Sequence, residues 1–248
     1  MSYHALARPS QATIAATGIA PAWRMMTPEP KEVAVSVAGG AIAITIDLGA
    51  VVQFDTAFVG FTNANPATPL QLSFGIAGAW EVAEGVGKVA LPTRAKAPRR
   101  HYLWQLGEPV LARYVGIAGN VPAGFQIGVV AAAQSFRPQW GPEFGHGRGI
   151  IDTGSATRRP DGGFGIVKGV RAATWQWTLG DLNDEEREEL FALIFDRGET
   201  ETLIAIEGGS IDPPYGESVH WSLLTRVEPY ERNDPGMTRW ALRIQDWA

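Results

Sequence analysis

The run Ile42-Ala-Ile-Thr-Ile-Asp-Leu-Gly49 decides the fold class of this chain. It is short, rich in β-branched residues and ended by glycine, which is typical of a strand in a β-sandwich. Further runs of the same character follow at 54–61, 111–117 and 125–130. The stretch from 42 to 136 therefore predicts a sandwich of short strands, and none of its runs resembles a catalytic motif.

The composition agrees with an all-β chain. Hydrophobic residues make up 45% and charged residues 19% of the 248 residues, so the chain can bury a sizeable core. The 29 glycines and 17 prolines are typical of many strands joined by turns. We therefore expect either one large β domain or two smaller ones.

Charge and cysteine content exclude several classes of function. The net charge of −5 argues against nucleic acid as the main partner, because phosphate binding needs a clustered basic surface. The chain has no cysteine, which excludes disulfides, thiolate zinc sites and cysteine nucleophiles.

Nothing at the N-terminus resembles an export signal. Residues 1–8 lack a basic segment followed by a continuous apolar segment, so we expect no secretory signal. No run approaches ~18 apolar residues, so we expect no membrane insertion. The chain is expected to be made in the cytoplasm.

The first 32 residues predict an N-terminal arm. They are rich in alanine, proline and threonine, with a short strand expected at 13–17. The arm either packs on the first domain or reaches a neighbouring subunit. After it, the run 33–37, a Gly39-Gly40 turn and the run 41–46 predict a β-hairpin.

Later residues extend the first domain. Leu70, Leu72 and Phe74 alternate along a strand and should face one way. Residues 85–100 predict a long exposed connection. Trp104 alternates within the next strand, so we expect it in the core.

These runs resemble a known domain family. The strand ending Asp47-Leu-Gly49, the run Phe54-Asp-Thr-Ala-Phe-Val-Gly-Phe61 and the run Leu111-Ala-Arg-Tyr-Val-Gly-Ile117 are similar to discoidin-like, galactose-binding-like jelly-roll domains. The resemblance covers residues 33–136 and implies a jelly roll over 33–137, with ligands held on variable loops. The chain departs from the secreted members of that family because it has no cysteine pair.

A change to proline, glycine and aromatic residues at 137–149 predicts a second domain over 138–248. Its strand 170–179 places Trp175, Trp177 and Leu179 on one apolar face. A helix is predicted over 184–197, because Asn183 can cap it and Glu186 stands three residues later.

The second half also carries a resemblance. Its Trp175-Gln-Trp-Thr-Leu179 strand, acidic helix and terminal hairpin are similar to small β domains of tailed-phage minor or distal tail proteins. The resemblance implies a structural component of a virion tail tip. Such a component would form a three- or six-fold ring between the tail tube and the receptor-binding apparatus. Its partners would be the tube, hub and tape-measure proteins.

No motif of the chain predicts catalysis. Asp152-Thr-Gly154 matches the tripeptide of aspartic proteases, but such an enzyme needs two copies and this chain has one, so a strand-end turn is favoured. Four carboxylates could serve as the acid pair of a glycosidase, but the sequence gives no reason to choose any two of them: Glu143, Asp152, Asp161 and Asp212.

The sequence predicts neither a metal nor a cofactor. The four histidines lack the spacing of metal ligands, and no nucleophile elbow or phosphate-binding glycine pattern is present. These histidines are spread along the chain: His4, His101, His146 and His220. We therefore expect no catalytic and no metal-binding residues.

Four residues are candidates for glycan or subunit contact. Trp80 and Trp140 lie in expected loops, where an indole can stack on a sugar ring; for Trp140 a wedge between the domains is favoured. Arg99 and Arg100 end a basic run that could meet an acidic neighbour.

Two hypotheses therefore remain open. The first is a tail-tip structural protein that assembles by burying aromatic and apolar surface between copies. The alternative is a carbohydrate-binding module that recognises a cell-surface glycan through loops of the jelly roll. A hydrolytic enzyme is the third and least favoured hypothesis.

Overall fold

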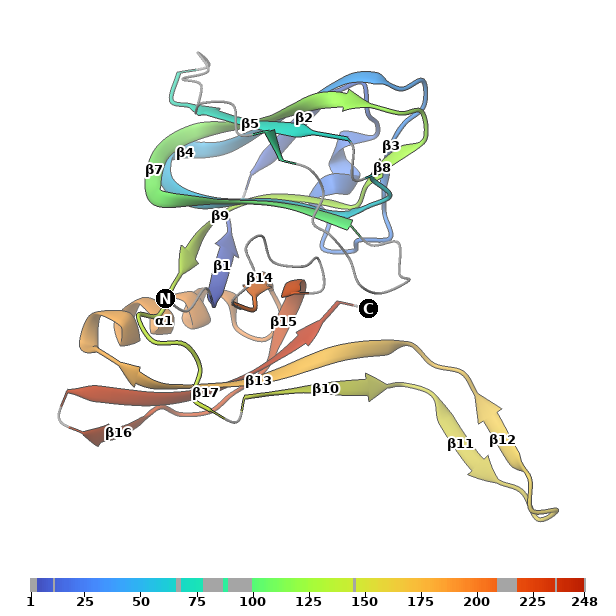
Figure 1. Ribbon diagram of the computed structural model, residues 1–248, viewed down its shortest axis with the longest axis vertical. Helices are drawn as coiled ribbons and strands as arrows, with labels where there is room; N and C mark the ends of the chain where they lie inside the picture. The colour runs from blue at the N-terminus through green and yellow to red at the C-terminus, as the bar shows by residue number, and fades with distance from the viewer. Residues whose placement is uncertain are drawn as a thin grey trace.

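The computed structural model describes residues 4–10, 12–65, 68–77, 87–88, 100–144, 146–208, 218–234 and 236–247. A β-sandwich lies above a second, more open sheet that carries the helix α1 (Figure 1). The predicted fold class, all-β with a sandwich followed by a β unit with one α-helix, is confirmed. In these ranges no helix has both the length and the apolar character needed to span a bilayer.

The sandwich is built from antiparallel strands and one short 3-10 helix. Its elements, in chain order, are β2 (Thr13–Thr17), η1 (Ala22–Met26), β3 (Ala34–Ser36), β4 (Gly40–Thr62), β5 (Leu70–Gly75), β6 (Gly87–Lys88), β7 (Arg100–Val121), β8 (Phe125–Ile127) and β9 (Val129–Phe136).

Two long strands, β4 and β7, pass through both layers of the sandwich. In one layer β2 pairs with residues 43–47 of β4, while β5 pairs with residues 114–119 of β7. In the other layer β9 pairs with residues 56–60 of β4. The register of β4 against β7 shifts between Asp47 and Val52, where both strands bend (Figure 1).

This bend joins runs that the sequence predicted as separate strands, 42–49 and 54–61. Gly49 adopts a positive φ of 77° at the bend, a conformation that glycine allows at little cost. The Asp47 carboxylate accepts the Gly49 N–H at 2.9 Å and the Arg113 Nε–H at 2.9 Å. The glycine therefore turns the strand without ending it.

The predicted hairpin over 33–46 is wrong. β3 pairs with β8, where Val35 lies opposite Gln126, and does not pair with β4. The two edges of β4 in this region are already occupied by β2 and β7. Local turn residues could not reveal that competition, because both competing strands are distant in the sequence.

The sandwich core lies between the two layers. Ile42, Ile44 and Ile46 of β4 alternate into it, and Trp104 of β7 is fully buried there, as predicted. Tyr102 stacks beside Trp104 with ring centroids 6.0 Å apart. The alternation that identified the strands thus also identifies the buried face.

The second unit is an antiparallel sheet covered on one face by α1. Its elements are β10 (Gly147–Asp152), β11 (Ser155–Arg158), β12 (Phe164–Val167), β13 (Arg171–Leu182), α1 (Asp184–Arg197), β14 (Thr202–Ile206), β15 (Val219–Val227), β16 (Glu231–Asp234) and β17 (Met237–Asp246).

The helix α1 has the bounds and the cap that the sequence predicts. Asn183 accepts the Glu186 N–H at 2.8 Å, and Glu186 accepts the Asn183 N–H at 3.0 Å, which completes the capping box. Leu190 and Leu193 pack against Trp177 and its neighbours on the sheet. The face that carries these two leucines is therefore the docked face.

The strand β1 (Ala5–Pro9) joins the two units into one sheet. Leu6 lies opposite Phe136 of β9 on one side and opposite Ala205 of β14 on the other. Ala5 and Ala7 point into a further core with Phe58 and Trp221. The segment expected as an N-terminal arm therefore supplies a central strand as well as β2.

A buried carboxylate strengthens the same junction. Asp55, on β4, accepts the Ser135 N–H at 2.9 Å and the Ser135 hydroxyl at 2.6 Å. Arg137 forms an ion pair with Asp55 at 3.2 Å. The carboxylate thus ties β4 to the end of β9, where the chain leaves the sandwich.

We predict that Leu6→Ala lowers the free energy of unfolding by about 3 kcal/mol, because it opens a cavity where the two units meet. The Leu6 side chain is only 1% exposed. Urea denaturation followed by tryptophan fluorescence measures the change.

Leu111→Ala is the matched control, because that leucine is 57% exposed on β7. Its effect should stay within about 0.5 kcal/mol. Equal losses in the two variants would contradict the assigned role of β1.

Candidate functional site

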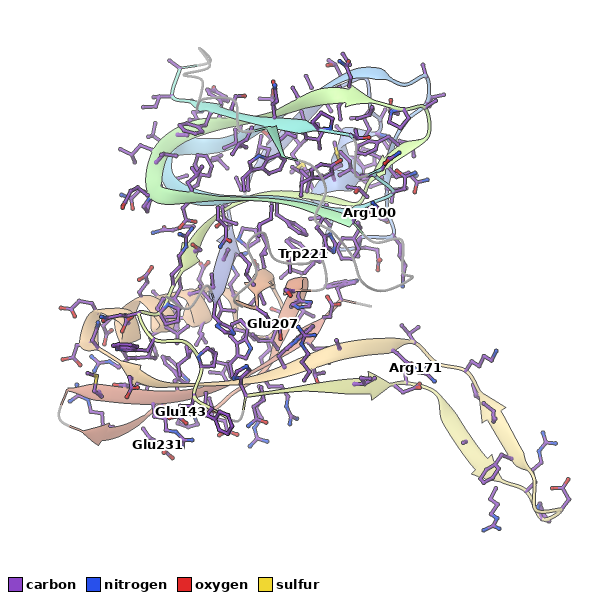
Figure 2. All side chains as sticks on the ribbon, viewed as in Figure 1. Arg100, Glu143, Arg171, Glu207, Trp221 and Glu231 are labelled. Atoms are coloured by element: carbon purple, nitrogen blue, oxygen red, sulfur yellow. The ribbon has the colours of Figure 1, made fainter. Side chains whose placement is uncertain are left out.

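Two of the four candidate contact residues, Arg100 and Trp140, lie in the part of the chain that the structure describes. Arg100 begins β7 on the sandwich, and Figure 2 shows it well away from the second unit's outer sheet. Trp140 lies in the connection between β9 and β10 and is 59% exposed, so most of its indole is not wedged between packed units. Trp80 and Arg99 lie outside the described residues.

The candidate carboxylates that the structure describes each have a different partner. Glu143 forms an ion pair with Arg239, and Asp161 accepts the Gly163 N–H in a tight turn. Asp212 lies outside the described residues. The described residues among these four therefore present no convergent acid pair.

Asp152-Thr-Gly154 forms the strand-end turn that the sequence favours. The Asp152 carboxylate accepts the Arg171 Nε–H at 2.8 Å and the Gly154 N–H at 2.7 Å. The hydrogen bond from Arg171 holds the pKa of Asp152 below its ordinary value. Such a fully ionised, paired carboxylate is unsuited to share a proton with a second aspartate.

The most distinctive surface is a hairpin that projects from the second unit, here called the projecting hairpin (residues 152–171). Figure 1 shows it extending beyond the sheet, and β11 and β12 within it form a separate two-stranded sheet. Phe164 is 63% exposed and Ile166 is 71% exposed. In the register of β11 and β12 these residues lie opposite Arg158 and Ala156.

Residues directly opposite in an antiparallel pair share one face of the sheet. Phe164, Ile166, Ala156 and Arg158 therefore form a narrow, uncovered apolar face that contains one cation. Val167 and Val170 add further exposed apolar surface nearby. The projecting hairpin thus presents apolar side chains to the solvent without packing them against the described body of the chain.

The hairpin is also basic. It contains four basic and two acidic side chains. Arg171 is paired with Asp152, but within the described residues Arg158, Arg159 and Lys168 form no ion pair. Three cations therefore remain available on this extension.

The sequence predicts no strand between the turn at 152–154 and the strand at 170–179, so this element was not expected. The turn Arg159-Pro-Asp-Gly162 joins β11 to β12, and Gly162 has a positive φ of 86°. A proline followed by aspartate and glycine is a turn signal. The flanking runs 155–158 and 164–167, read with that turn, would have predicted the hairpin.

An ion pair between the exposed Arg148 and the buried Glu207 fixes the sheet near the root of the projecting hairpin. Arg148 of β10 donates Nε–H to Glu207 at 3.1 Å and contacts the second carboxylate oxygen through Nη2. His220 lies 3.7 Å from Glu207 and packs on the Trp175 ring. Figure 2 shows Glu207 between the sandwich and the part of the second unit's sheet that contains β10 and β13.

Burial alone would raise the pKa of Glu207. Hydrogen bonding and charge attraction from His220 and Arg148 outweigh that effect and hold the pKa below its ordinary value. The group is therefore ionised at neutral pH and serves as a fixed anchor for Arg148. A carboxyl group that donates a proton in catalysis would instead need a raised pKa.

Folding brings together histidines that are distant in the sequence. The His4 and His146 rings lie 5.7 Å apart in an edge arrangement, and His4 also meets Trp177. Burial, and next the nearby His146, lower the pKa of His4. Across the described ranges, no group of three potential ligands could hold a metal ion.

A cleft of ≈ 540 Å³ opens between the two units. η1, β9 and the turn between α1 and β14 contribute its walls, with Arg197, Glu201, Met25 and Trp221 among the lining residues. Arg197 donates to Glu201 at 2.7 Å, and Trp221 donates Nε1–H to the Pro28 carbonyl at 3.0 Å. The cleft therefore combines one aromatic side chain with a charged pair.

The outer face of α1 is the second exposed apolar surface. Phe191 and Phe195 stack with ring centroids 6.1 Å apart, and Phe195 is 83% exposed. The helix contains six carboxylates against two arginines. Asp184, Glu188 and the two phenylalanines lie on one stripe, at intervals of three and four residues.

Neither a protein-family model nor a curated protein matches this chain. The resemblance to phage tail proteins therefore receives no support from these comparisons.

Solved structures do resemble about half of the chain. Chitosan-binding module 1 of a Paenibacillus chitosanase/glucanase aligns at TM-score 0.39 and 14% identity, over 50% of this chain and 96% of that one. The module CBM32-1 from a family 31 glycoside hydrolase of Clostridium perfringens aligns at TM-score 0.38 and 10% identity, over 51% and 96%.

A GH29 fucosidase of Ruminococcus gnavus aligns at TM-score 0.39 and 14% identity, over 50% of this chain and 25% of that one. Several of these similar structures are carbohydrate-binding modules. At these TM-scores and identities, the ligands and activities of those proteins do not transfer to this chain.

We predict that Glu207→Gln reduces the pH dependence of stability in the acid range. The folded chain has the lower pKa, so ionised Glu207 stabilises the fold above its ordinary value of 4.5. That contribution is lost as the pH falls through the lower folded pKa. Urea midpoints measured between about pH 6 and pH 3 should converge for the two proteins at the acid end.

Glu185→Gln is the control, because Glu185 is exposed on α1 and forms no ion pair in the described part of the chain. It should reproduce the wild-type curve. A constant difference between wild type and Glu207→Gln at every pH would contradict the ionised anchor.

Proposed function

We propose that this chain is a non-catalytic structural subunit that assembles with further copies of itself. The observation that carries the proposal is the projecting hairpin, whose apolar face is uncovered in the single chain. Concentrated exposed apolar surface marks interaction sites in soluble proteins.

The stability of the hairpin supports the same proposal. An isolated two-stranded hairpin is at best marginally stable in water, and four-residue strands such as β11 and β12 are short. Packing Phe164 and Ile166 against another chain would remove their side chains from water. Burial of two such side chains contributes several kcal/mol, at about 1.5–3 kcal/mol each.

The setting we propose is the tail tip of a tailed phage. A closed ring between the tail tube and the receptor-binding apparatus would place this chain among tube, hub and tape-measure proteins. Support for the setting comes from the sequence resemblance of the strand 175–179 and the acidic helix. The self-assembly proposal does not depend on that setting.

We predict that the double variant Phe164→Ser and Ile166→Ser converts the assembled protein to a folded monomer. The two serines remove the apolar contact while leaving the hairpin turn intact. Sedimentation equilibrium measures the mass of wild type and variant, and thermal unfolding followed by circular dichroism checks the fold.

Leu111→Ser is the matched control, because Leu111 is also exposed but lies on β7 of the sandwich. It should leave the wild-type assembly intact. A monomeric wild type, or an unchanged mass for the double variant, would overturn the self-assembly proposal.

The cleft favours a second candidate function, recognition of a cell-surface glycan. Sugar sites are concave and hold a few polar groups, and the cleft offers the exposed Glu201 beside Arg197, whereas Trp221 is 5% exposed and stacks on Phe58. This function is compatible with assembly, because the cleft lining does not include residues of the projecting hairpin.

We predict that Glu201→Gln weakens binding of a cell-wall polysaccharide by about tenfold, since a charged hydrogen bond is worth about 1.5 kcal/mol or more. A glycan array identifies the probe, and isothermal titration calorimetry measures its affinity for wild type and variant.

Glu199→Gln, two residues earlier and outside the cleft lining, is the matched control. It should bind the polysaccharide as wild type does. The absence of any bound glycan on the array would exclude the second candidate.

A further inference from the structure

We infer that the projecting hairpin docks on the outer face of α1 in a neighbouring copy of this chain. The inference rests on the proposed self-assembly and names the surface that receives the hairpin. Three independent features of the two surfaces support this pairing: their charges, their apolar side chains and their positions in the molecule.

The charges of the two surfaces are complementary. The projecting hairpin has four basic and two acidic side chains, whereas α1 has six acidic and two basic side chains. Arg158, Arg159 and Lys168 form no ion pair in the described ranges, and neither does Glu185, whereas Asp184 and Glu188 already pair with Arg187 of the same chain. Contact between copies would give the hairpin cations and Glu185 partners of opposite charge.

Glu189 lies on the inner side of α1, where it lines a pocket with Ser135 and Phe136 of β9. Burial, and next the nearby Asp55 and Glu186, raise the pKa of Glu189. This carboxylate is therefore not part of the outer face that would receive the hairpin.

Apolar side chains accompany the charges on both surfaces. Phe191 and Phe195 stack on α1, and Phe191 also approaches Trp240 of β17 at 6.2 Å. On the hairpin, Phe164 and Ile166 lie on the same face as Arg158. Each surface thus offers apolar contact area with ionic groups beside it, an arrangement typical of protein interfaces.

The positions of the two surfaces require a second chain. Figure 1 shows the projecting hairpin and α1 at opposite ends of the second unit, so one chain cannot pair its own surfaces. An interface between two different surfaces of identical subunits is heterologous, and it produces a ring when the rotation closes. Each copy would then give one hairpin and receive one.

Nucleic acid fits the hairpin less well than a second copy does. A nucleic-acid surface needs clustered cations, whereas three of the four residues on the exposed face of β11 and β12 are apolar. The chain as a whole carries a net charge of −5, which opposes polyanion binding. The same apolar and cationic mixture matches α1.

Charge reversal on the full-length protein tests the inference. The hairpin variant is Arg158→Glu with Arg159→Glu, and the helix variant is Glu185→Lys with Glu188→Lys. We expect each variant alone to associate at least about tenfold more weakly than wild type, because each places like charges opposite each other. Sedimentation velocity measures the association.

Recombination of the variants distinguishes direct contact from separate damage. A protein that carries all four substitutions restores opposite charges across the interface, so we expect its association to return to within about threefold of wild type. An equimolar mixture of the two double variants should also assemble. Circular dichroism and thermal unfolding should show that every variant is folded.

Two results would overturn different claims. If Phe164→Ser with Ile166→Ser prevents assembly but the helix variant assembles like wild type, the hairpin docks elsewhere: self-assembly stands and this inference fails. If wild type is monomeric throughout, the self-assembly proposal and this inference both fail.

Phe195→Ser gives a second test that does not depend on charge. This variant should assemble more weakly than wild type. Association equal to that of wild type would contradict docking on α1.

Discussion

The pairing of β1 with both β9 and β14 is the interaction on which the rest of the structure depends. In the part of the chain that the structure describes, β1 carries the strand pairing between the sandwich and the second sheet. With it, a ladder of backbone hydrogen bonds runs across both units, and Leu6 is buried where they join. This continuity connects α1, the cleft and the root of the projecting hairpin through one sheet. The proposed ring assembly would need a defined rotation between copies, which a continuous sheet favours.

The continuous sheet ends at the root of the projecting hairpin. Arg148 and Glu207 hold β10 to the end of β14, so the sheet remains anchored close to the root of the projecting hairpin. Beyond Asp152 the chain leaves the sheet, and β11 and β12 pair only with each other. An element anchored at one end and uncovered at the other keeps its direction while presenting its far end to a partner.

Local features of the sequence predicted the elements whose causes are local. The Asn183–Glu186 capping box identified the helix. The buried strand face was identified by Trp175 and Trp177, which alternate with the polar Gln176. The partner of β3 depended on strands distant in the sequence, and the clustering of His4 with His146 depended on the complete fold. Trp140 shows the same limit, because aromatic character alone does not distinguish a buried wedge from an exposed side chain.

The distribution of unpaired groups is more informative about function than their number. Scattered exposed apolar residues are normal on a soluble protein. Here apolar side chains and unpaired cations coincide on one extension, while stacked phenylalanines and unpaired carboxylates coincide on α1. A chain that acted alone would gain solubility if these aromatic side chains were polar. Their separation to opposite ends of the second unit is the arrangement that the proposed heterologous contact between identical chains would use.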